Sequence, residues 1–292
     1  MDNTKKLNTI DTEQNNPNSK NFSSLNTIEM VDIIINEDAQ ITQKIAQQKQ
    51  KISQIIDLAY QKVKFNKGRL IYIGAGTSGR IGILDASEIY PTYGVKDKVL
   101  ALIAGGQKAI TNAYENVEDD ENQAIEDLKN INFNQNDILV GLAASGRTPY
   151  VVAALKYAKK INAACVSIAN TNNALISKYA DIFLEINTGA EVITGSTRMK
   201  AGTSQKMICN IISTSLMTKL GYVEQNYMIN LIPSNKKLVQ RCKNIIKIIT
   251  DANDQKIDEV FEQTKNVKMS IIMLKENVNY EQAKKIYEEI YE

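Results

Sequence analysis

The chain has 292 residues, with 35 basic and 33 acidic side chains and a formal net charge of +2. This near balance gives no reason to expect binding to nucleic acid or to a membrane surface, and the length suffices for one large domain or two small ones. Histidine is absent, which removes the commonest general base and the commonest metal ligand. Acid–base chemistry would therefore use carboxylates, lysine, tyrosine or cysteine, and neither a metal nor another cofactor is expected.

The N-terminal segment is rich in Asn, Ser, Thr and Lys up to about residue 24, a composition that predicts an irregular, disordered tail. It has no apolar core typical of a signal peptide, and no stretch of the chain reaches transmembrane length. Cys165, Cys209 and Cys242 are widely spaced and form no C-x-x-C pair. This pattern indicates reduced, buried thiols in a cytoplasmic protein.

Residues 27–64 are helical in pattern. Their apolar residues recur at helical spacing on one face: Ile52, Ile55, Ile56, Ala59 and Val63. We expect these helices to pack beside the next domain or against another subunit.

Apolar strands alternate with helical segments from residue 69 to about 220. The candidate strands are 70–73, 98–103, 137–142, 163–168 and 181–185. Such alternation predicts an α/β fold with a doubly wound parallel sheet flanked by helices. The chain is accordingly divided into an N-terminal tail with helices (1–64), an α/β domain (65–225) and a small C-terminal helical region (226–292).

A glycine-rich turn follows the first of these strands. Gly74, Gly76 and Gly79 enclose Thr77 and Ser78, and a helical pattern begins past Gly79. Outward-pointing amides, a helix N-terminus and two hydroxyls make an anion site. The glycines also match the dinucleotide fingerprint, but the second strand is not followed by the acid that would hold a ribose. The hydroxyl pair suits a phosphomonoester better.

A second turn of the same kind follows the third strand. It contains Ser145, Gly146 and Thr148, and Thr148 and Pro149 suit the N-cap and the first position of a new helix. In parallel sheets, ligands bind at the carboxyl ends of strands where the winding reverses. Two such turns could hold one phosphorylated sugar; for each turn taken alone, ordinary capping of a βα-loop is the alternative.

A third stretch, GAEVITGSTRMKAGTSQK at 189–206, is dense in Gly, Ser and Thr. It contains Glu191 and Ser196 and the cations Arg198, Lys200 and Lys206. Hydroxyls beside cations favour a loop held against an anionic ligand, and a basic surface loop is the alternative. A largely buried helix is expected over 201–219.

The C-terminal region is predicted to be helical from 234 to 292. The apolar face of its first helix is predicted to consist of Leu238, Val239, Cys242, Ile245 and Ile248. Shorter helices are expected near 253–262, 265–275 and 280–291.

Three stretches coincide with a known family: GAGTSGRIGILDASE at 74–88, AASGRTPYV at 143–151 and the stretch at 189–206. Through them the chain resembles the N-acetylmuramic acid 6-phosphate etherases, which belong to the sugar isomerase (SIS) domain superfamily. The third stretch looks like the signature that this family shares with glucokinase regulatory protein. Supporting stretches lie at 12–19, 102–110 and 114–120, so the resemblance covers nearly the whole chain. The family usually continues into a glycine-containing tail, whereas this sequence stops at Glu292.

The resemblance implies an activity and a site. The family cleaves the lactyl ether of N-acetylmuramic acid 6-phosphate to N-acetylglucosamine 6-phosphate and D-lactate, as a metal-free cytoplasmic homodimer that serves recycling of the cell-wall sugar. Glu88 matches its proton donor through Asp-Ala-Ser-Glu, and Glu118 matches its second catalytic glutamate. The substrate-binding residues predicted within the three stretches are Thr77, Ser78, Gly79, Ser145, Gly146, Thr148, Glu191, Ser196 and Lys200.

The chemistry is consistent with a pair of carboxyl groups. Ring opening gives an aldehyde at C1 that acidifies the C2 proton; a carboxylate removes that proton, a carboxylic acid protonates the departing lactate oxygen, and water then adds at C3. Without the motif match, both glutamates would be interpreted as solvated surface charges. Two other functions are considered: a non-catalytic sugar-phosphate sensor, and an aldose–ketose isomerase on the same fold. Chain length favours the etherase over the sensor, because the regulatory protein carries two such domains, and the isomerase gives no account of the 189–206 stretch.

Overall fold

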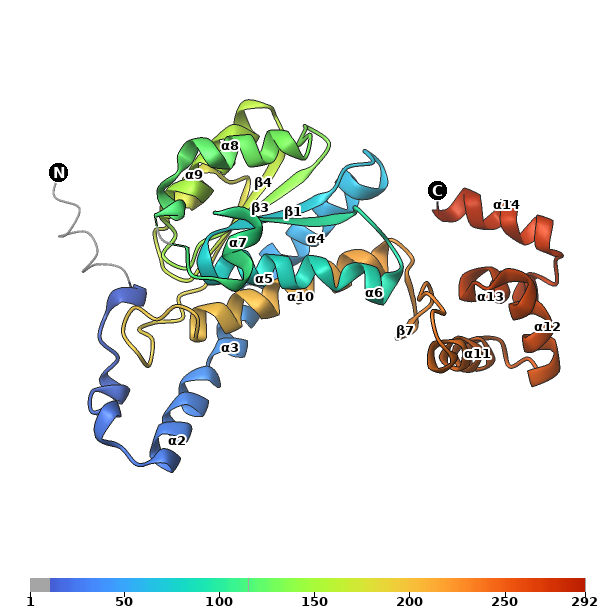
Figure 1. Ribbon diagram of the computed structural model, residues 1–292, viewed down its shortest axis with the longest axis horizontal. Coiled ribbons are helices and arrows are strands. Elements are labelled where there is room, and N and C mark those ends of the chain that lie inside the picture. Colours follow the sequence, from blue (N-terminus) through green and yellow to red (C-terminus); the bar gives the residue numbers. More distant parts are fainter. Residues whose placement is uncertain (1–10, 115, 292) are drawn as a thin grey trace. The chain divides into compact units, whose positions relative to one another are not determined.

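A five-stranded parallel sheet forms the centre of the chain, with strand order β2-β1-β3-β4-β5. It is seen in a computed structural model whose described residues are 11–114 and 116–291 (Figure 1). The strands are β1 (Leu70–Gly74), β2 (Val99–Ile103), β3 (Ile138–Leu142), β4 (Ala164–Ala169) and β5 (Ile182–Glu185). All five predicted strands are confirmed to within one residue at each end, and the doubly wound parallel sheet with them.

Helices cover both faces of the sheet. Figure 1 shows α8 (Glu121–Asn130) and α9 (Pro149–Lys160) over one face, where they pack on Ile71 and Leu139. The opposite face carries α5 (Gly76–Ser87) and the first part of α10 (Lys200–Lys219). On that face the Tyr72 hydroxyl donates to the carbonyl of Cys209 at 3.3 Å. Alternation of side chains along each strand, one face after the other, produces these two cores.

The segment 27–64 forms three helices, as predicted: α2 (Thr27–Asp38), α3 (Ile41–Ala46) and α4 (Lys49–Lys64). The apolar face predicted for α4 is buried throughout. Helix α2 differs, because its only buried side chain is that of Glu37. A further short helix, α7 (Gly106–Thr111), follows β2.

The prediction of an irregular tail is wrong for residues 11–24, while residues 1–10 lie outside the described part of the chain. Three 3-10 turns form there: η1 (Asp11–Glu13), η2 (Pro17–Ser19) and η3 (Phe22–Ser24). The Asn16 amide donates to the carbonyl of Ala190 at 3.0 Å, and the Ser19 hydroxyl to that of Val192 at 2.7 Å. The polar residues that suggested disorder are therefore donors to backbone groups more than 170 residues away.

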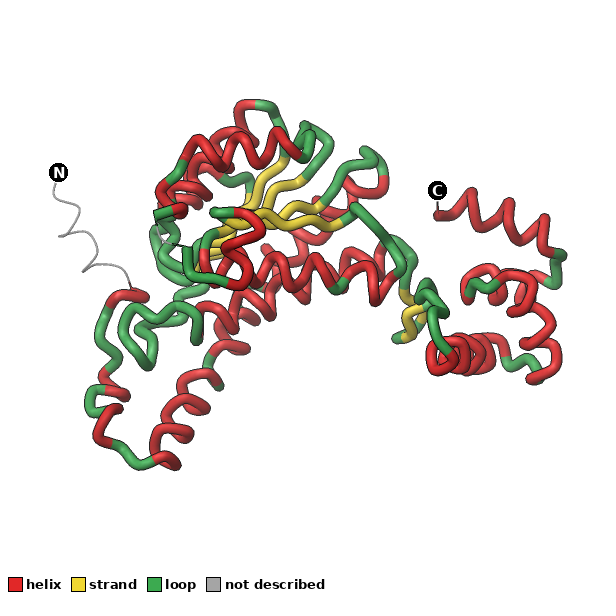
Figure 2. Tube along the Cα trace, in the orientation of Figure 1, coloured by secondary structure: helices red, strands yellow, loops and turns green. Residues whose placement is uncertain are grey.

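The chain divides into two compact units, each described by itself. The first contains the described residues up to Ala86 together with Asp97–Ser213, and the second contains Ser87–Lys96 and the residues from Thr214 onward. The second unit contains α6 (Ile89–Tyr93), the last residues of α10 and a hairpin of β6 (Val223–Glu224) and β7 (Tyr227–Met228). It ends in the helices α11 (Lys236–Thr250), α12 (Asp254–Thr264), α13 (Val267–Glu276) and α14 (Tyr280–Tyr291). Figure 2 shows that helices and loops make up nearly all of this unit.

The predicted apolar face of α11 is wrong at one position. Ile248 is 50% exposed, and the buried face is formed by Cys242, Ile245, Ile246 and Ile249. Ile248 lies six residues after Cys242, which places it off a face that recurs every three to four residues. No helix among the described residues is long and apolar enough to cross a membrane.

Candidate functional site

The two hydroxyl-bearing turns flank the point where the winding of the sheet reverses. Strands β1 and β3 are neighbours, with Gly74 opposite Leu142, and they lead into helices on opposite faces. Ligands of doubly wound sheets bind in the crevice at such a switch point. The sheet topology therefore brings the two turns to the same edge of the sheet, next to each other.

The first turn is shorter than predicted, because α5 begins at Gly76 rather than after Gly79. Thr77 and Ser78 consequently lie in the first turn of the helix, and the Gly79 N–H already donates to the carbonyl of Ala75 at 3.2 Å. The first N–H groups of a helix have no acceptor within it. The amides free to face an anion are therefore those of residues 76–78, before Gly79.

Glycines let the helix start this close to the strand end. A Cβ atom on Gly79 would stand 2.8 Å from the carbonyl oxygen of Gly74 and 2.5 Å from Cγ1 of Ile103. Real Cβ atoms do not approach other atoms so closely, so a larger residue at 79 would push α5 away from the sheet. Ser78, next to it, is buried, whereas Thr77 is half-buried.

In the second turn, Gly146 has φ +68°, and a Cβ there would lie 2.4 Å from that of Ala174. Its N–H donates to the carbonyl of Ala143 at 2.9 Å. Thr148 is the N-cap of α9 and Pro149 its first residue, as predicted, but the Thr148 hydroxyl makes no capping hydrogen bond. The Thr148 hydroxyl therefore does not cap the start of α9, which weakens the interpretation of this turn as an ordinary capped loop.

Arg147 is a candidate that the sequence reasoning missed. It stands between Gly146 and Thr148, and its Nε atom is buried with no hydrogen-bond partner among the described residues. A buried guanidinium donor without an acceptor is costly unless a ligand or water satisfies it. The available signal was its place within the second turn, beside the predicted hydroxyls.

The third stretch is built around two buried charges. Glu191 is fully buried and accepts the N–H groups of Lys200 and Ala201, each at 2.9 Å, so it caps the start of α10. Burial raises the pKa of Glu191, and these two N–H bonds oppose the rise. The Lys200 ammonium pairs with the carboxylate of Glu37 on α2. Both predicted binding residues thus have partners within the chain, and their contact with substrate stays a prediction.

Glu37 lies at the centre of this network. Burial alone would raise its pKa, but hydrogen bonds from Asn18, Lys200 and Asn16, together with the charge of Lys200, outweigh burial and lower the pKa. The start of α10 also reaches the first turn, because a Cβ atom on Gly202 would lie 3.4 Å from Cγ2 of Thr77. The third stretch therefore adjoins the switch point, with Ser196 half-buried in its loop.

Glu118 lies in η4 (Val117–Asp119), is exposed and lines a cavity of about 410 Å³. Gly76, Arg80 and Tyr114 line the same cavity. The Arg80 guanidinium donates to the carbonyls of Ile110 and Asn112 at 2.9 and 2.8 Å, which holds this wall in place. The cavity thus connects Glu118 with the first turn.

Glu88 is exposed at the N-cap of α6, in the second unit, and does not line this cavity. The pairing of Glu88 with Glu118 stays a prediction. In the described part of the chain, no three Cys, Asp or Glu side chains are grouped in a way that could hold a metal ion.

The fold and the paired turns define a protein of the SIS-domain class. Two family models match, the glucokinase regulatory protein N-terminal SIS domain over residues 48–159 and the SIS domain over 108–215. A Bacteroides fragilis structure, described as a candidate phosphosugar isomerase involved in capsule formation, has a TM-score of 0.53 at 19% identity and covers 69% of this chain and 95% of its own. A phosphoheptose isomerase from Francisella tularensis has a TM-score of 0.50 at 16% identity, covering 65% of this chain and 100% of its own.

Sequence relatives narrow this class to one family. The N-acetylmuramic acid 6-phosphate etherase of Lactobacillus acidophilus is 46% identical over 96% of this chain and 94% of its own. The etherase of Francisella tularensis is 46% identical over 95% of each chain, and that of a Clostridium botulinum strain is 48% identical over 92% of this chain and 89% of its own. The chain belongs to the N-acetylmuramic acid 6-phosphate etherase family, which confirms the resemblance drawn from its motifs.

Proposed function

We propose that this protein is a carbon–oxygen lyase that cleaves the lactyl ether of N-acetylmuramic acid 6-phosphate by elimination and water addition. The products are N-acetylglucosamine 6-phosphate and D-lactate. The observation that carries the proposal is 46% identity to an etherase over 96% of the chain. The model built on the regulatory protein matches only residues 48–159, and the isomerase structures share less than 20% identity, so neither supports the alternative functions.

The phosphate is proposed to bind at the switch point. Helices α5 and α9 begin there, and each N-terminus favours an anion by roughly 0.3–1 kcal/mol. Ser78, Ser145 and Thr148 would donate their hydroxyls, and the guanidinium of Arg147 would add a charge-assisted bond. The sugar ring would then extend toward the cavity that Glu118 lines.

Glu88 is proposed as the acid that protonates the departing lactate oxygen. Glu118 would stay ionised and either remove the C2 proton or guide the incoming water. Both side chains are exposed, so both are accessible to a substrate. This division needs a protonated carboxyl and a carboxylate in one site, which two glutamates supply in a chain without histidine.

Assembly and location complete the proposal. We expect a homodimer, with the 27–64 helices and the 189–206 stretch near the interface. Cys165, Cys209 and Cys242 are buried, free thiols, which favours a reducing compartment such as the cytoplasm. There the reaction would serve the breakdown and recycling of cell-wall amino sugars.

The decisive experiment is incubation of the purified protein with N-acetylmuramic acid 6-phosphate and an assay for D-lactate. Glu88→Gln keeps the shape of the side chain but cannot donate an acidic proton, so lactate release should fall about 10²-fold or more. Ser145→Ala should instead raise KM. Absence of lactate from the wild-type protein would refute the function.

Exchange of the C2 hydrogen in deuterated water separates the two roles. If Glu118 is the base, Glu118→Gln should lose the exchange while Glu88→Gln retains some of it. The reverse pattern would swap the assignments, and near-normal turnover in both variants would remove the pair from the mechanism.

A further inference from the structure

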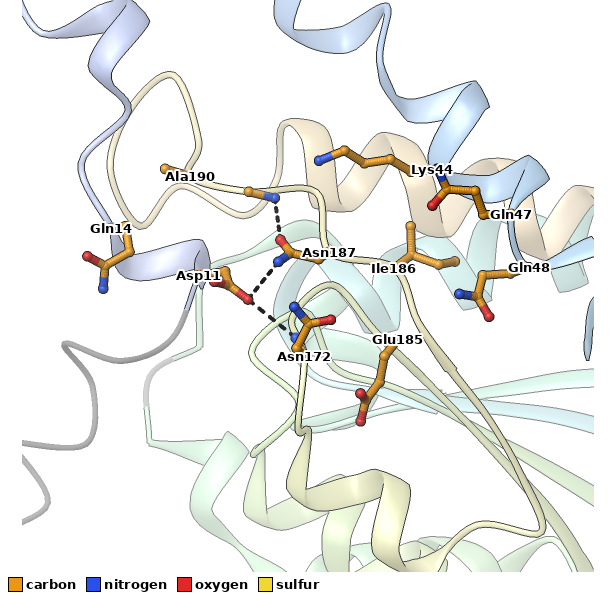
Figure 3. A pocket seen from close by; sticks show the side chains of 11 residues that line it. Asp11, Gln14, Lys44, Gln47, Gln48, Asn172, Glu185, Ile186, Asn187 and Ala190 are labelled. Carbon is orange, nitrogen blue, oxygen red and sulfur yellow. Dashed lines mark hydrogen bonds between the residues drawn. The ribbon is translucent and has the colours of Figure 1, made fainter.

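A second cavity, of about 550 Å³, opens at the ends of β4 and β5 (Figure 3). Its wall comes from η1 and the residue after it, from the end of α3 and the residues after it, from Asn172 in the loop after β4, and from residues 185–190. None of the residues that the structure describes lines both this cavity and the one beside Glu118. It lies wholly within the first compact unit, so it is a separate candidate for ligand binding.

Two carboxylates in the wall already have partners. Asp11 accepts hydrogen bonds from the Asn187 side chain at 2.9 Å and from the Asn172 N–H at 3.3 Å, as Figure 3 shows. Glu185 accepts the N–H of Ala174 at 2.9 Å and the hydroxyl of Ser177 at 2.7 Å. These bonds fix the shape of the wall and use much of the acceptor capacity of both acids.

Lys44 and the neighbouring amides are not engaged in this way. Among the described residues, the Lys44 ammonium makes no ion pair or hydrogen bond, and the side-chain amides of Gln47, Gln48 and Asn172 make no hydrogen bond. In Figure 3 the Lys44 side chain extends toward the loop that carries Ala190. Burial, with the charge of Lys200, lowers the pKa of Lys44, as expected of a cation that lacks a close partner.

The charges of the wall decide which ligand fits. With two carboxylates and one ammonium, the wall has a net negative charge, which disfavours a phosphomonoester because that group carries nearly two negative charges. A single carboxylate could reach the Lys44 ammonium, while the amides offer both donors and acceptors to hydroxyl groups. Among the described residues of the lining, Ile186 has the one large apolar side chain, and the volume is that of a site for a small polar molecule.

We propose that this cavity binds an unphosphorylated monosaccharide acid, with its carboxylate on Lys44 and its hydroxyls on the amides of Gln47, Gln48 and Asn172. The site is independent of the phosphate site at the β1–β3 switch point. Its wall continues directly from Ala190 into Glu191, the cap of α10, so an occupant would adjoin the network that positions the third stretch.

Calorimetric titration of the full chain with N-acetylmuramic acid tests the proposal. This sugar has one carboxylate and no phosphate. Lys44→Met should weaken its binding about tenfold, the value of one charge-assisted hydrogen bond. Lys49→Met, the same change at an exposed lysine of α4 outside the cavity, should leave the affinity unchanged. N-acetylglucosamine, which lacks the carboxylate, should bind the wild type and Lys44→Met equally weakly.

Competition separates this site from the switch point. Saturating N-acetylglucosamine 6-phosphate should leave the titration unchanged, and competition between the two sugars would overturn the proposal. It would equally be overturned by no measurable binding of N-acetylmuramic acid or by unchanged affinity in Lys44→Met. Thermal melting checks that Lys44→Met folds; if it does not, Gln48→Ala supplies the same comparison and should weaken binding severalfold.

Discussion

Lys200 and Glu37 form a buried ion pair that ties the start of α10 to α2. Both side chains are only 6% exposed, and Glu37 also accepts the amides of Asn16 and Asn18 at 2.8 and 2.7 Å. Breaking such a pair leaves a charge buried without its partner, which costs far more than the pair itself contributes. The stability of the third stretch therefore depends on both charges.

Lys200→Met should lower the free energy of unfolding by about 3–5 kcal/mol. The double variant Glu37→Gln/Lys200→Met should recover part of this loss, because no buried charge then stands alone. Urea denaturation at neutral pH measures both values. Unchanged stability with a raised KM in Lys200→Met would contradict the structural role and favour direct contact with substrate.

The pair should also make stability depend on pH. Because the pKa of Glu37 is lowered in the folded chain, its contribution is fully present above the ordinary glutamate pKa of 4.5 and is lost as the pH falls through the lower folded value. The difference in unfolding free energy between the wild type and Glu37→Gln should therefore shrink on acidification below about pH 4. A difference that grows in acid would contradict this sign.

Helix α5 begins directly after β1, with only Ala75 between them. Gly79 faces the end of that strand and Ile103 of β2 without room for a Cβ atom, whereas Gly202 at the start of α10 has ordinary clearance, with its nearest neighbours at 3.4 Å. Gly79 follows Thr77 by two residues in α5, and Gly202 faces the Thr77 side chain from α10. Each lies in the first turn of its helix, Gly79 in α5 and Gly202 in α10, and the two differ in the room that a Cβ atom would have.

Gly79→Ala should cost about 1–3 kcal/mol through overpacking, and it should raise KM because α5 moves with its hydroxyls. Gly202→Ala should be neutral or stabilising by up to about 1 kcal/mol, since alanine favours helices over glycine. Thermal melting and steady-state kinetics of both variants make the comparison. Equal effects at the two positions would show that tight packing at Gly79 is not what matters.

At the scale of the whole molecule, α2 presents an apolar stripe to solvent. Ile28, Val31 and Ile35 are 65%, 43% and 60% exposed at helical spacing, although the helix is anchored by buried Glu37. An exposed stripe of this kind marks an interaction surface. In the proposed homodimer, the partner that covers it is a second copy of the chain.

Ile28→Asp/Ile35→Asp should therefore convert a homodimer into monomers, because the charges cannot be buried in an apolar interface. Ile248→Asp is the matched control: this isoleucine is 50% exposed on α11 in the second unit, and its substitution should leave the dimer intact. Light scattering at micromolar concentration gives the mass. A wild-type monomer with full activity would refute the dimer.

The sequence by itself determined the elements and the family. Short apolar runs predicted the five strands, and the dipeptide Thr148-Pro149 marked the start of α9, because these signals are local in the chain. The motifs likewise identified the etherase family. The division into segments 1–64, 65–225 and 226–292 stays a prediction, since the compact units follow other boundaries.

Only the tertiary structure decided what the polar side chains contact. Asn16 and Glu37 meet across 21 residues, and Glu37 meets Lys200 across 163, so no local pattern could distinguish Lys200 as an ion-paired residue or Asn16 as an ordered one. The early start of α5 likewise depends on the space between Gly79 and the strand ends. The type of a side chain determines which groups it is able to bind. Its actual partner depends on which distant segments lie beside it once the sheet and its helices have packed.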